Sequence, residues 1–187
     1  MINIIENINY DYVSELLIDK NIVALFQGKS EAGQRALGNR SLLFDPRVID
    51  GKDIVNRVKK RENFRPFAGS ILLECANEWF NMIGLEESPY MCYSLDCLEH
   101  KSKYIPGIIH VDNTSRIQTL TKDQNFHFYN LIESFYKKTS VPILLNTSFN
   151  LAGEPLVETV ENAIDTFYTS DINYLYFPEL SYLITKK

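Results

Sequence analysis

Short apolar runs alternate with polar segments along the whole chain, and many of these runs are too short to form helices. They contain β-branched and other apolar residues and end at turn-forming residues such as glycine, aspartate and proline. This pattern is typical of strands. It predicts strands over residues 22–26, 41–44, 70–73, 107–111, 117–120 and 141–145.

Other segments have apolar residues spaced three or four positions apart, as on one face of a helix. They cover residues 11–20, 53–60, 126–138 and 160–167, and Asp11 is placed to cap the first. The chain has no internal repeat and no linker rich in proline, glycine or serine. We therefore expect an α/β or α+β fold, a twisted mixed sheet with flanking helices, in a single domain over residues 1–187.

The composition agrees with an ordinary globular domain. Of the 187 residues, 45% are hydrophobic and 23% are charged, which excludes disordered, collagen-like and coiled-coil proteins. No apolar run approaches the roughly 20 residues that cross a bilayer. A secretory signal has basic residues before its apolar run, and no basic residue precedes the first apolar residues here. The three cysteines form no CxxC pair and are interpreted as ordinary thiols. We therefore expect a cytoplasmic protein with no membrane span.

Charge is distributed unevenly along the chain. The formal net charge is −5, yet the segment from Gly28 to Arg65 holds ten basic and five acidic residues and carries +5. The remainder of the chain carries −10. A cationic segment within an acidic chain indicates an anionic partner.

The cationic segment begins with a candidate binding loop, residues 28–47. Its glycines permit a ligand to approach the backbone closely. Arg35, Arg40 and Arg47 have the forked donors that bind phosphate or carboxylate. The glycine spacing fits neither a P-loop nor a Rossmann fingerprint, and a surface loop with solvated arginines is the alternative.

A second cationic group, Lys59, Arg61 and Arg65, begins at the end of the predicted helix over 53–60 and continues into the turn after it. The general attraction of cations to a helix C-terminus also explains Lys60 and Arg61. Arg65 lies between aromatic residues and a proline. We therefore expect Arg65 to be partly buried and to need a buried carboxylate or an anionic ligand.

The predicted strand over 141–145 runs directly into hydroxyl and amide side chains, those of Asn146, Thr147, Ser148 and Asn150. Such residues are common in turns. Ligands, however, gather at the carboxyl ends of strands in open α/β sheets. We therefore interpret these side chains as part of a binding site.

A last candidate lies in residues 110–119. Arg116, which follows Thr114 and Ser115, is a candidate anion-binding residue. His110 and Asp112 form an HxD pair on one side of a predicted extended segment, but no third ligand accompanies them. We therefore expect no metal site and interpret His110 as structural.

Five motifs occur together in the order and approximate spacing of one known family. They are GKSEAGQRALGNRSLLFDPR, VKKRENFRPF, SPYM, HVDNTSRIQT and PILLNTSFNLAGEPLV. On these motifs the chain resembles the C-terminal, YrdC-like domain of the O-carbamoyltransferases that include the nodulation-factor, cephalosporin and tobramycin enzymes. The resemblance extends from about the first predicted helix to Phe177.

The resemblance implies a YrdC-like fold and an activity. In this family the domain joins carbamoyl phosphate to ATP, taken up with Mg²⁺, to form carbamoyl-adenylate and pyrophosphate. A second domain then passes the carbamoyl group to a hydroxyl acceptor. Cationic donors in a preformed cleft offset the repulsion between two polyanions, which suits a sequence without an obvious nucleophile or triad.

The resemblance also assigns residues. Lys59-Lys60-Arg61 matches the Lys-x-Arg signature of YrdC-like proteins, and Ser148-Phe149-Asn150 matches their Ser-x-Asn signature. The implied catalytic residues are Lys59, Arg61 and Arg65. The implied set that binds carbamoyl phosphate and ATP, which we expect to line one cleft, is Arg35, Lys59, Arg61, Arg65, Arg116, Asn146, Thr147, Ser148 and Asn150.

The sequence also departs from the family pattern. Gln34 and Ala32 replace the proline and phenylalanine of EFGPRALG, so the loop is expected to be less rigid or differently filled. Gly69 replaces a proline in FRPFAPS. The family's N-terminal transfer domain, with its histidine-rich metal site, has no counterpart in this sequence. We expect that domain as a separate polypeptide or on a part of the protein outside this sequence.

Two other functions remain open from the sequence. One is a module that binds nucleotide or nucleic acid without chemistry, since a cationic segment also suits a phosphate backbone. Nucleic acid is the weaker form of this alternative, because the segment is short and has no basic-aromatic stripe. The other is a non-catalytic subunit that docks on a transferase partner. Release of pyrophosphate from ATP that depends on carbamoyl phosphate distinguishes the enzyme from both.

Overall fold

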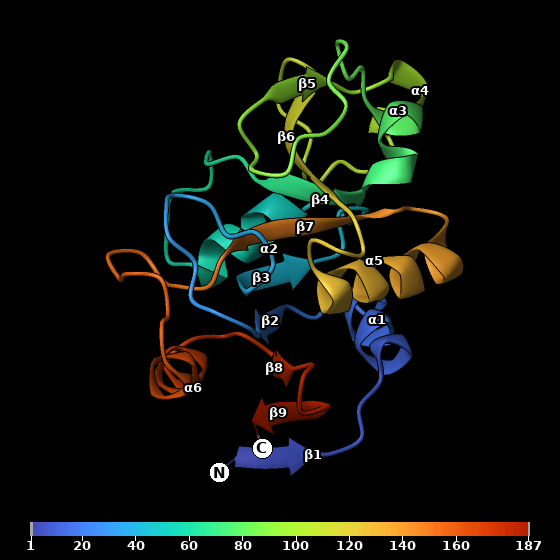
Figure 1. The fold of residues 1–187 in the computed structure, drawn as a ribbon. Coiled ribbons are helices and arrows are strands. Elements are labelled where there is room, and N and C mark those ends of the chain that lie inside the picture. The colour runs from blue at the N-terminus through green and yellow to red at the C-terminus, as the bar shows by residue number, and fades with distance from the viewer. Residues whose placement is uncertain (1, 187) are drawn as a thin grey trace.

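A computed structural model describes residues 2–186, which form a mixed sheet of nine strands flanked by helices (Figure 1). The strand order is β1-β9-β8-β2-β3-β7-β4-β6-β5. Neighbouring strands are antiparallel, except that β2 runs parallel to β8 and β4 parallel to β6. The strands are β1 (Ile2–Ile5), β2 (Val23–Phe26), β3 (Arg40–Phe44), β4 (Ala68–Leu72), β5 (Ser94–Asp96), β6 (Thr114–Leu120), β7 (Ile143–Ser148), β8 (Tyr174–Phe177) and β9 (Tyr182–Lys186). The helices are α1 (Tyr10–Ile18), α2 (Gly51–Val58), a short 3-10 helix (Leu73–Cys75), α3 (Ala76–Trp79), α4 (Glu99–Ser102), α5 (Phe126–Thr139) and α6 (Val160–Tyr168).

Most of the elements predicted from the sequence are present, and the predicted fold class is confirmed. The predicted helices correspond to α1, α2, α5 and α6, and five predicted strands correspond to β2, β3, β4, β6 and β7. The predicted cap of α1 is wrong. Asn9, not Asp11, accepts the N–H of Tyr12, while the Asp11 carboxylate accepts the hydroxyl of Ser134 at 2.5 Å.

The predicted strand over 107–111 is wrong. These residues form a turn, in which Gly107 donates its N–H to the carbonyl oxygen of Pro46 at 2.9 Å and Ile108 donates to Ile105 at 3.1 Å. The run is apolar because Ile108 is fully buried against β4, not because its backbone joins a sheet. The sequence also missed β1, β5, β8 and β9.

Helices cover the central strands. α1 and α5 pack against each other, with α5 over β4 and β7 and α1 over β2. α6 contacts β2 and β8 and lies away from α5 in Figure 1. No helix among residues 2–186 has the length and apolar character needed to cross a membrane.

β7 is buried along most of its length and emerges at its carboxyl end. Successive side chains point to opposite faces of a sheet, and both Leu144 and Leu145 are fully buried, so both faces of β7 are covered here. Thr147 and Ser148, at the end of the strand, are partly exposed. The polar end of β7 is therefore the part that a ligand can reach.

The register of the sheet brings separate segments to this end of β7. Ala68, the first residue of β4, pairs with Asn146 of β7. In the parallel ladder of β4 and β6, Gly69 pairs with Ile117. Arg116 therefore lies beside Ala68, and the cationic segment that precedes β4 reaches the end of β7.

Close packing explains why position 69 holds glycine. A Cβ atom on Gly69 would lie 2.6 Å from Cδ1 of Ile108 and 2.9 Å from Cγ2 of Ile143. Packed interiors do not accommodate such contacts. The turn over 105–108 thus fills the space that a side chain at position 69 would need.

Candidate functional site

Two cavities adjoin at the carboxyl end of β7 and share Arg61 and Ser148 in their walls. Their volumes are about 520 Å³ and about 100 Å³. Of the residues proposed from the sequence, the larger cavity is lined by Lys59, Arg61, Arg65, Ser148 and Asn150. The smaller cavity is lined by Arg35, Arg61, Arg116, Asn146, Thr147 and Ser148. The structure therefore brings the whole proposed set to one end of the sheet, with Arg65 and Ser148 in the same cavity.

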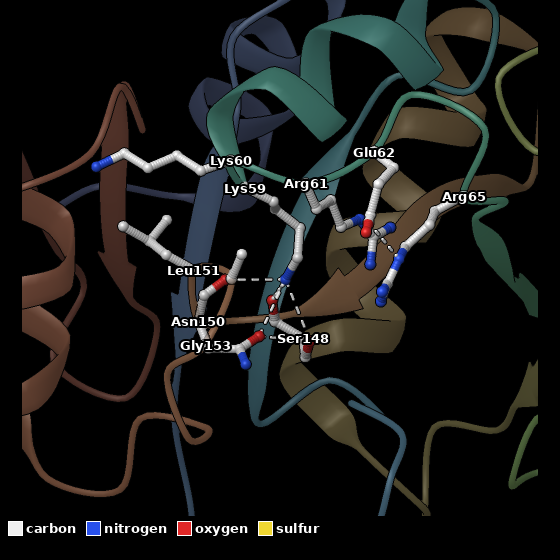
Figure 2. Close-up of a pocket in the computed structure, with 10 residues that line it drawn as sticks. Lys59, Lys60, Arg61, Glu62, Arg65, Ser148, Asn150, Leu151 and Gly153 are labelled. Atoms are coloured by element: carbon white, nitrogen blue, oxygen red, sulfur yellow. Dashed lines mark hydrogen bonds and ion pairs between the residues drawn. The ribbon is translucent and has the colours of Figure 1, made fainter.

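Lys59 is fixed between the two polar residues of the Ser-x-Asn motif. The residue is 3% exposed, and its Nζ donates to the backbone oxygens of Ser148 and Asn150, to Ser148 Oγ at 3.2 Å and to Asn150 Oδ1 at 3.0 Å. Ser148 Oγ in turn donates to Asn150 Oδ1 at 2.7 Å. Figure 2 shows the ammonium group among these oxygens, while Lys60 points away. Lys59 therefore fixes the shape of the turn that follows β7.

Burial changes the protonation equilibrium of Lys59. Loss of solvation, and then the nearby Arg61 guanidinium, lower the pKa of Lys59 to about 7, against the opposing effect of Glu154. An anion in the cavity favours the ammonium form over the neutral amine. Binding of an anion above pH 7 is therefore coupled to uptake of a proton.

Sulfate affinity is expected to fall as the pH rises from 7 to 9. Sulfate does not titrate in this range, so the change reports the protein, and each pH unit above the pKa of Lys59 weakens binding by up to about tenfold. Calorimetry at several pH values, in buffers of different ionisation enthalpy, measures both the affinity and the proton uptake. The Lys60→Ala variant should give the same pH profile. An affinity that does not change between pH 6 and pH 9 would contradict this assignment.

Arg61 stands between the two cavities. Its Nε donates to Oδ1 of Asn56 at 2.6 Å, and its guanidinium lies over the Phe67 ring, 4.5 Å from the centroid. Burial and then repulsion from Arg65 lower the pKa of Arg61 to about 10, and Arg116 acts in the same direction. An anion placed beside Arg61 would relieve this repulsion, so the arrangement favours anion binding.

The predicted environment of Arg65 is wrong. Its side chain is 53% exposed and pairs with the exposed carboxylate of Glu62 at 2.8 Å, not with a buried acid. Phe64 is 83% exposed, so this neighbour provides no apolar cover. Arg65 nevertheless lines the larger cavity, together with Lys59 and Arg61.

The smaller cavity combines three arginines, Arg35, Arg61 and Arg116, with a buried amide. Burial and then repulsion from Arg35 lower the pKa of Arg116. Asn146 is 2% exposed, and its Nδ2 donates to the carbonyl oxygen of Ala36 at 3.1 Å and to Ser70 Oγ at 2.9 Å. These bonds attach the loop that carries Arg35 to the central strands.

Two arginines of the candidate loop, Arg40 and Arg47, make structural contacts and do not line the two cavities. Arg40 is 3% exposed, and it donates to backbone carbonyls, including that of Glu158 at 3.2 Å. Its guanidinium lies 3.6 Å from the centroid of the Phe26 ring. Arg47 pairs with the buried carboxylate of Asp45 at 2.6 Å. Of the three arginines in this loop, Arg35 is therefore the one that lines a cavity.

His110 is held by its neighbours. Its Nδ1 lies 3.1 Å from Thr114 Oγ1 and its Nε2 lies 3.3 Å from the carbonyl oxygen of Phe67. Asp112 accepts the N–H and the hydroxyl of Thr114 in the turn that leads into β6. In the described part of the chain, no three or more His, Cys, Asp or Glu residues are grouped so that they could hold a metal ion.

The sequence interpretation missed Asn56. This residue of α2 is fully buried, and its Nδ2 donates to the carbonyl oxygens of Asn63 and Arg65, both at 3.1 Å. Its Oδ1 accepts from Arg61, so Asn56 fixes the whole segment that carries the arginines. The hydrophobic pattern held no signal for Asn56, because at about 100° per residue it lies off the apolar face of Ile54, Val55 and Val58.

The carbamoyltransferase C-terminus family model matches residues 14–186. The chain belongs to this family. Nodulation protein NolNO of Sinorhizobium fredii is 45% identical to this carbamoyltransferase C-terminal domain over 176 residues, which are 93% of the chain and 26% of NolNO. The 3'-hydroxymethylcephem-O-carbamoyltransferase of Amycolatopsis lactamdurans is 33% identical over 157 residues, 84% of the chain and 29% of that enzyme. The chain thus spans less than a third of either relative.

A solved structure shows the same fold as this carbamoyltransferase C-terminal domain. Full-length HypF, crystallised in a phosphate- and nucleotide-bound form, matches with a TM-score of 0.61 at 18% identity. The match covers 90% of the chain and 27% of HypF. HypF confirms the expected YrdC-like fold, and the family model and the relatives confirm the resemblance to the carbamoyltransferases.

Proposed function

We propose that this chain is the activating domain of an O-carbamoyltransferase and forms carbamoyl-adenylate from carbamoyl phosphate and ATP. The observation that carries the proposal is the pair of adjoining cationic cavities that share Arg61 and Ser148 in a member of this family. Two polyanionic substrates that are bound side by side need adjoining sites whose cations offset their repulsion. The phosphate and nucleotide bound to HypF, a protein of the same fold, also support it.

The sizes of the cavities suggest which substrate each one takes. The cavity of about 520 Å³, with Lys59 and Arg65, suits the triphosphate of ATP. The cavity of about 100 Å³, with Arg35 and Arg116, suits a molecule that has one phosphate and one carbamoyl group. Arg61 would then lie where the two substrates meet.

The proposed reaction consumes one water molecule. Carbamoyl-adenylate retains only the α-phosphate of ATP, so the phosphate of carbamoyl phosphate leaves as orthophosphate when water attacks and carbamate forms. A carbamate oxygen then attacks the α-phosphorus, and the bond from this phosphorus to the β-phosphate oxygen breaks, which releases pyrophosphate. The protein contributes electrostatic stabilisation through Lys59, Arg61 and Arg65, and no side chain forms a covalent bond.

Mg²⁺ would enter this site as part of the substrate. Among the described residues that line the larger cavity, Glu62 is the single carboxylate, and it is paired with Arg65. Mg²⁺ prefers several oxygen ligands and is commonly bound through substrate phosphates. The residues present therefore fit an ion that is carried by the triphosphate.

Incubation of the chain with ATP, Mg²⁺ and carbamoyl phosphate is expected to release pyrophosphate and orthophosphate in equal amounts. Release should be slow, because no acceptor removes the adenylate, and should stop when carbamoyl phosphate is omitted. Enzyme-coupled assays for both products measure the ratio. Binding of ATP without any release would instead indicate a nucleotide-binding module. Absence of both binding and release would indicate a docking subunit.

We further propose that transfer to the acceptor takes place on another domain or subunit. Carbamoyl-adenylate is a reactive mixed anhydride that water destroys, so it should pass directly from a closed site to the next. On this view residues 1–187 are one activating domain, which works in the cytoplasm where ATP is supplied. Efficient carbamoylation of a hydroxylated acceptor by the chain alone, in the same incubation, would show that no second domain is needed.

A further inference from the structure

Arg35 belongs to a loop with little regular backbone structure. Residues 27–39 contain no helix or strand. The hydrogen bond that the Arg35 guanidinium makes within residues 2–186 is to the carbonyl oxygen of its neighbour Gln34, at 3.3 Å, and no carboxylate there pairs with it. The place of Arg35 beside the smaller cavity therefore depends on what holds the loop backbone.

The carboxylate of Glu31 closes this loop. Its Oε1 accepts the N–H groups of Leu37 at 2.7 Å and Asn39 at 3.0 Å, and its Oε2 accepts the N–H of Arg40 at 3.1 Å. Residues 31–37 thus form a closed loop, and Arg35 lies inside it. Hydrogen bonds from backbone N–H groups to a charged carboxylate are stronger than those to a neutral acceptor.

The three hydrogen bonds of the Glu31 carboxylate, called here the clamp, are anchored to the sheet. The loop that the clamp closes holds Arg35 near Arg116, and these two cations repel each other. Arg40, the first residue of β3, is tied to backbone carbonyls, and the negative charge of Glu31 stabilises its guanidinium. On the other side of the cavity, Arg35 and Arg116 repel each other. Without a closed loop, Arg35 could move into solvent and escape this repulsion.

We propose that Glu31 is a positioning residue whose carboxylate keeps Arg35 opposite Arg116, so that both arginines bind one phosphate group in the smaller cavity. This inference rests on the proposed function for the identity of the anion, carbamoyl phosphate. The geometry of the clamp itself is independent of that assignment.

A double-mutant cycle with inorganic phosphate as the probe tests the inference. Calorimetry on the full chain compares the wild type with Glu31→Gln, Arg35→Ala and the double variant. We expect Arg35→Ala to weaken phosphate binding about tenfold, and Glu31→Gln about fivefold because one clamp acceptor and the charge are lost. The double variant should be no weaker than Arg35→Ala. Additive losses, or an unchanged affinity in Arg35→Ala, overturn the inference.

Two further variants separate positioning from a general effect on the fold or charge. Glu179→Gln changes an exposed carboxylate between β8 and β9, which accepts the Gly28 N–H of this loop at 3.3 Å, and should leave phosphate affinity unchanged. Glu31→Asp keeps the charge but withdraws the oxygens, and should lose as much affinity as Glu31→Gln. Wild-type affinity in Glu31→Asp also overturns the inference. If the cycle is non-additive but carbamoyl phosphate triggers no pyrophosphate release, the proposed function fails and the positioning role stands.

Discussion

Replacing Lys59 by alanine is expected to reduce pyrophosphate release by at least about 100-fold and to lower the free energy of unfolding by about 3 kcal/mol. The variant loses the ammonium group that fills the space between Ser148 and Asn150. Ser148 Oγ still donates to Asn150 Oδ1, but the backbone oxygens of Ser148 and Asn150 lose the ammonium donor, so the turn after β7 loses its shape. The pyrophosphate assay and urea-induced unfolding measure the two effects.

The neighbouring lysine provides a matched control for this variant. Lys60 is exposed, and its Nζ lies 3.5 Å from the carbonyl oxygen of Thr169, outside the Lys59 network. Lys60→Ala should therefore keep near-wild-type stability and activity. Lys59→Met, which keeps much of the side-chain volume, should also lose activity. Wild-type pyrophosphate release by a folded Lys59→Met variant would remove Lys59 from the proposed site.

Arg61→Ala is expected to lower pyrophosphate release by about 100- to 1,000-fold. In the proposed reaction the Arg61 guanidinium stabilises negative charge on both substrates, and the variant loses this group. Its stability effect should be smaller than that of Lys59→Ala. The loss of one guanidinium relieves the repulsion with Arg65 and Arg116, although Oδ1 of Asn56 loses its donor. Single-turnover measurements with each substrate varied in turn should show weaker use of both ATP and carbamoyl phosphate.

Two comparison variants sharpen the test of Arg61. Arg61→Lys keeps the charge but not the forked donors, so it should recover little activity if Arg61 contacts two anions at once. Arg57→Ala, on the exposed side of α2, should have no effect. A defect limited to one substrate would show that Arg61 serves one cavity and does not join them.

The parts of the site that could be predicted from the sequence are those with a local signal. Lys59 and Arg61 follow an amphipathic helix, and Ser148 and Asn150 follow a fully apolar run. Each pair thus lies at the end of an element that the periodicity already predicts. The same holds for β2, β3 and β7, whose buried runs are clear in the sequence.

The misplaced residues depend on partners that are distant in sequence. Arg40 looks like a ligand-binding arginine, and its burial follows from contacts such as that with the carbonyl oxygen of Glu158, 118 positions away. Arg65 was expected to be covered by Phe64, but that ring points into solvent. The run over 107–111 has the composition of a strand and pairs instead with Pro46. Local patterns cannot distinguish these outcomes, because tertiary contacts decide them.

The pairing of β1 with β9 determines where any attached polypeptide would begin. Ile2 is the register partner of Lys186, so the backbone enters and leaves the sheet at one edge. Four strands, β9, β8, β2 and β3, separate β1 from β7, and at the usual spacing of strands this is roughly 24 Å. Any domain or subunit that takes up a product formed at the end of β7 would therefore act at a distance from the edge where the chain enters and leaves the sheet.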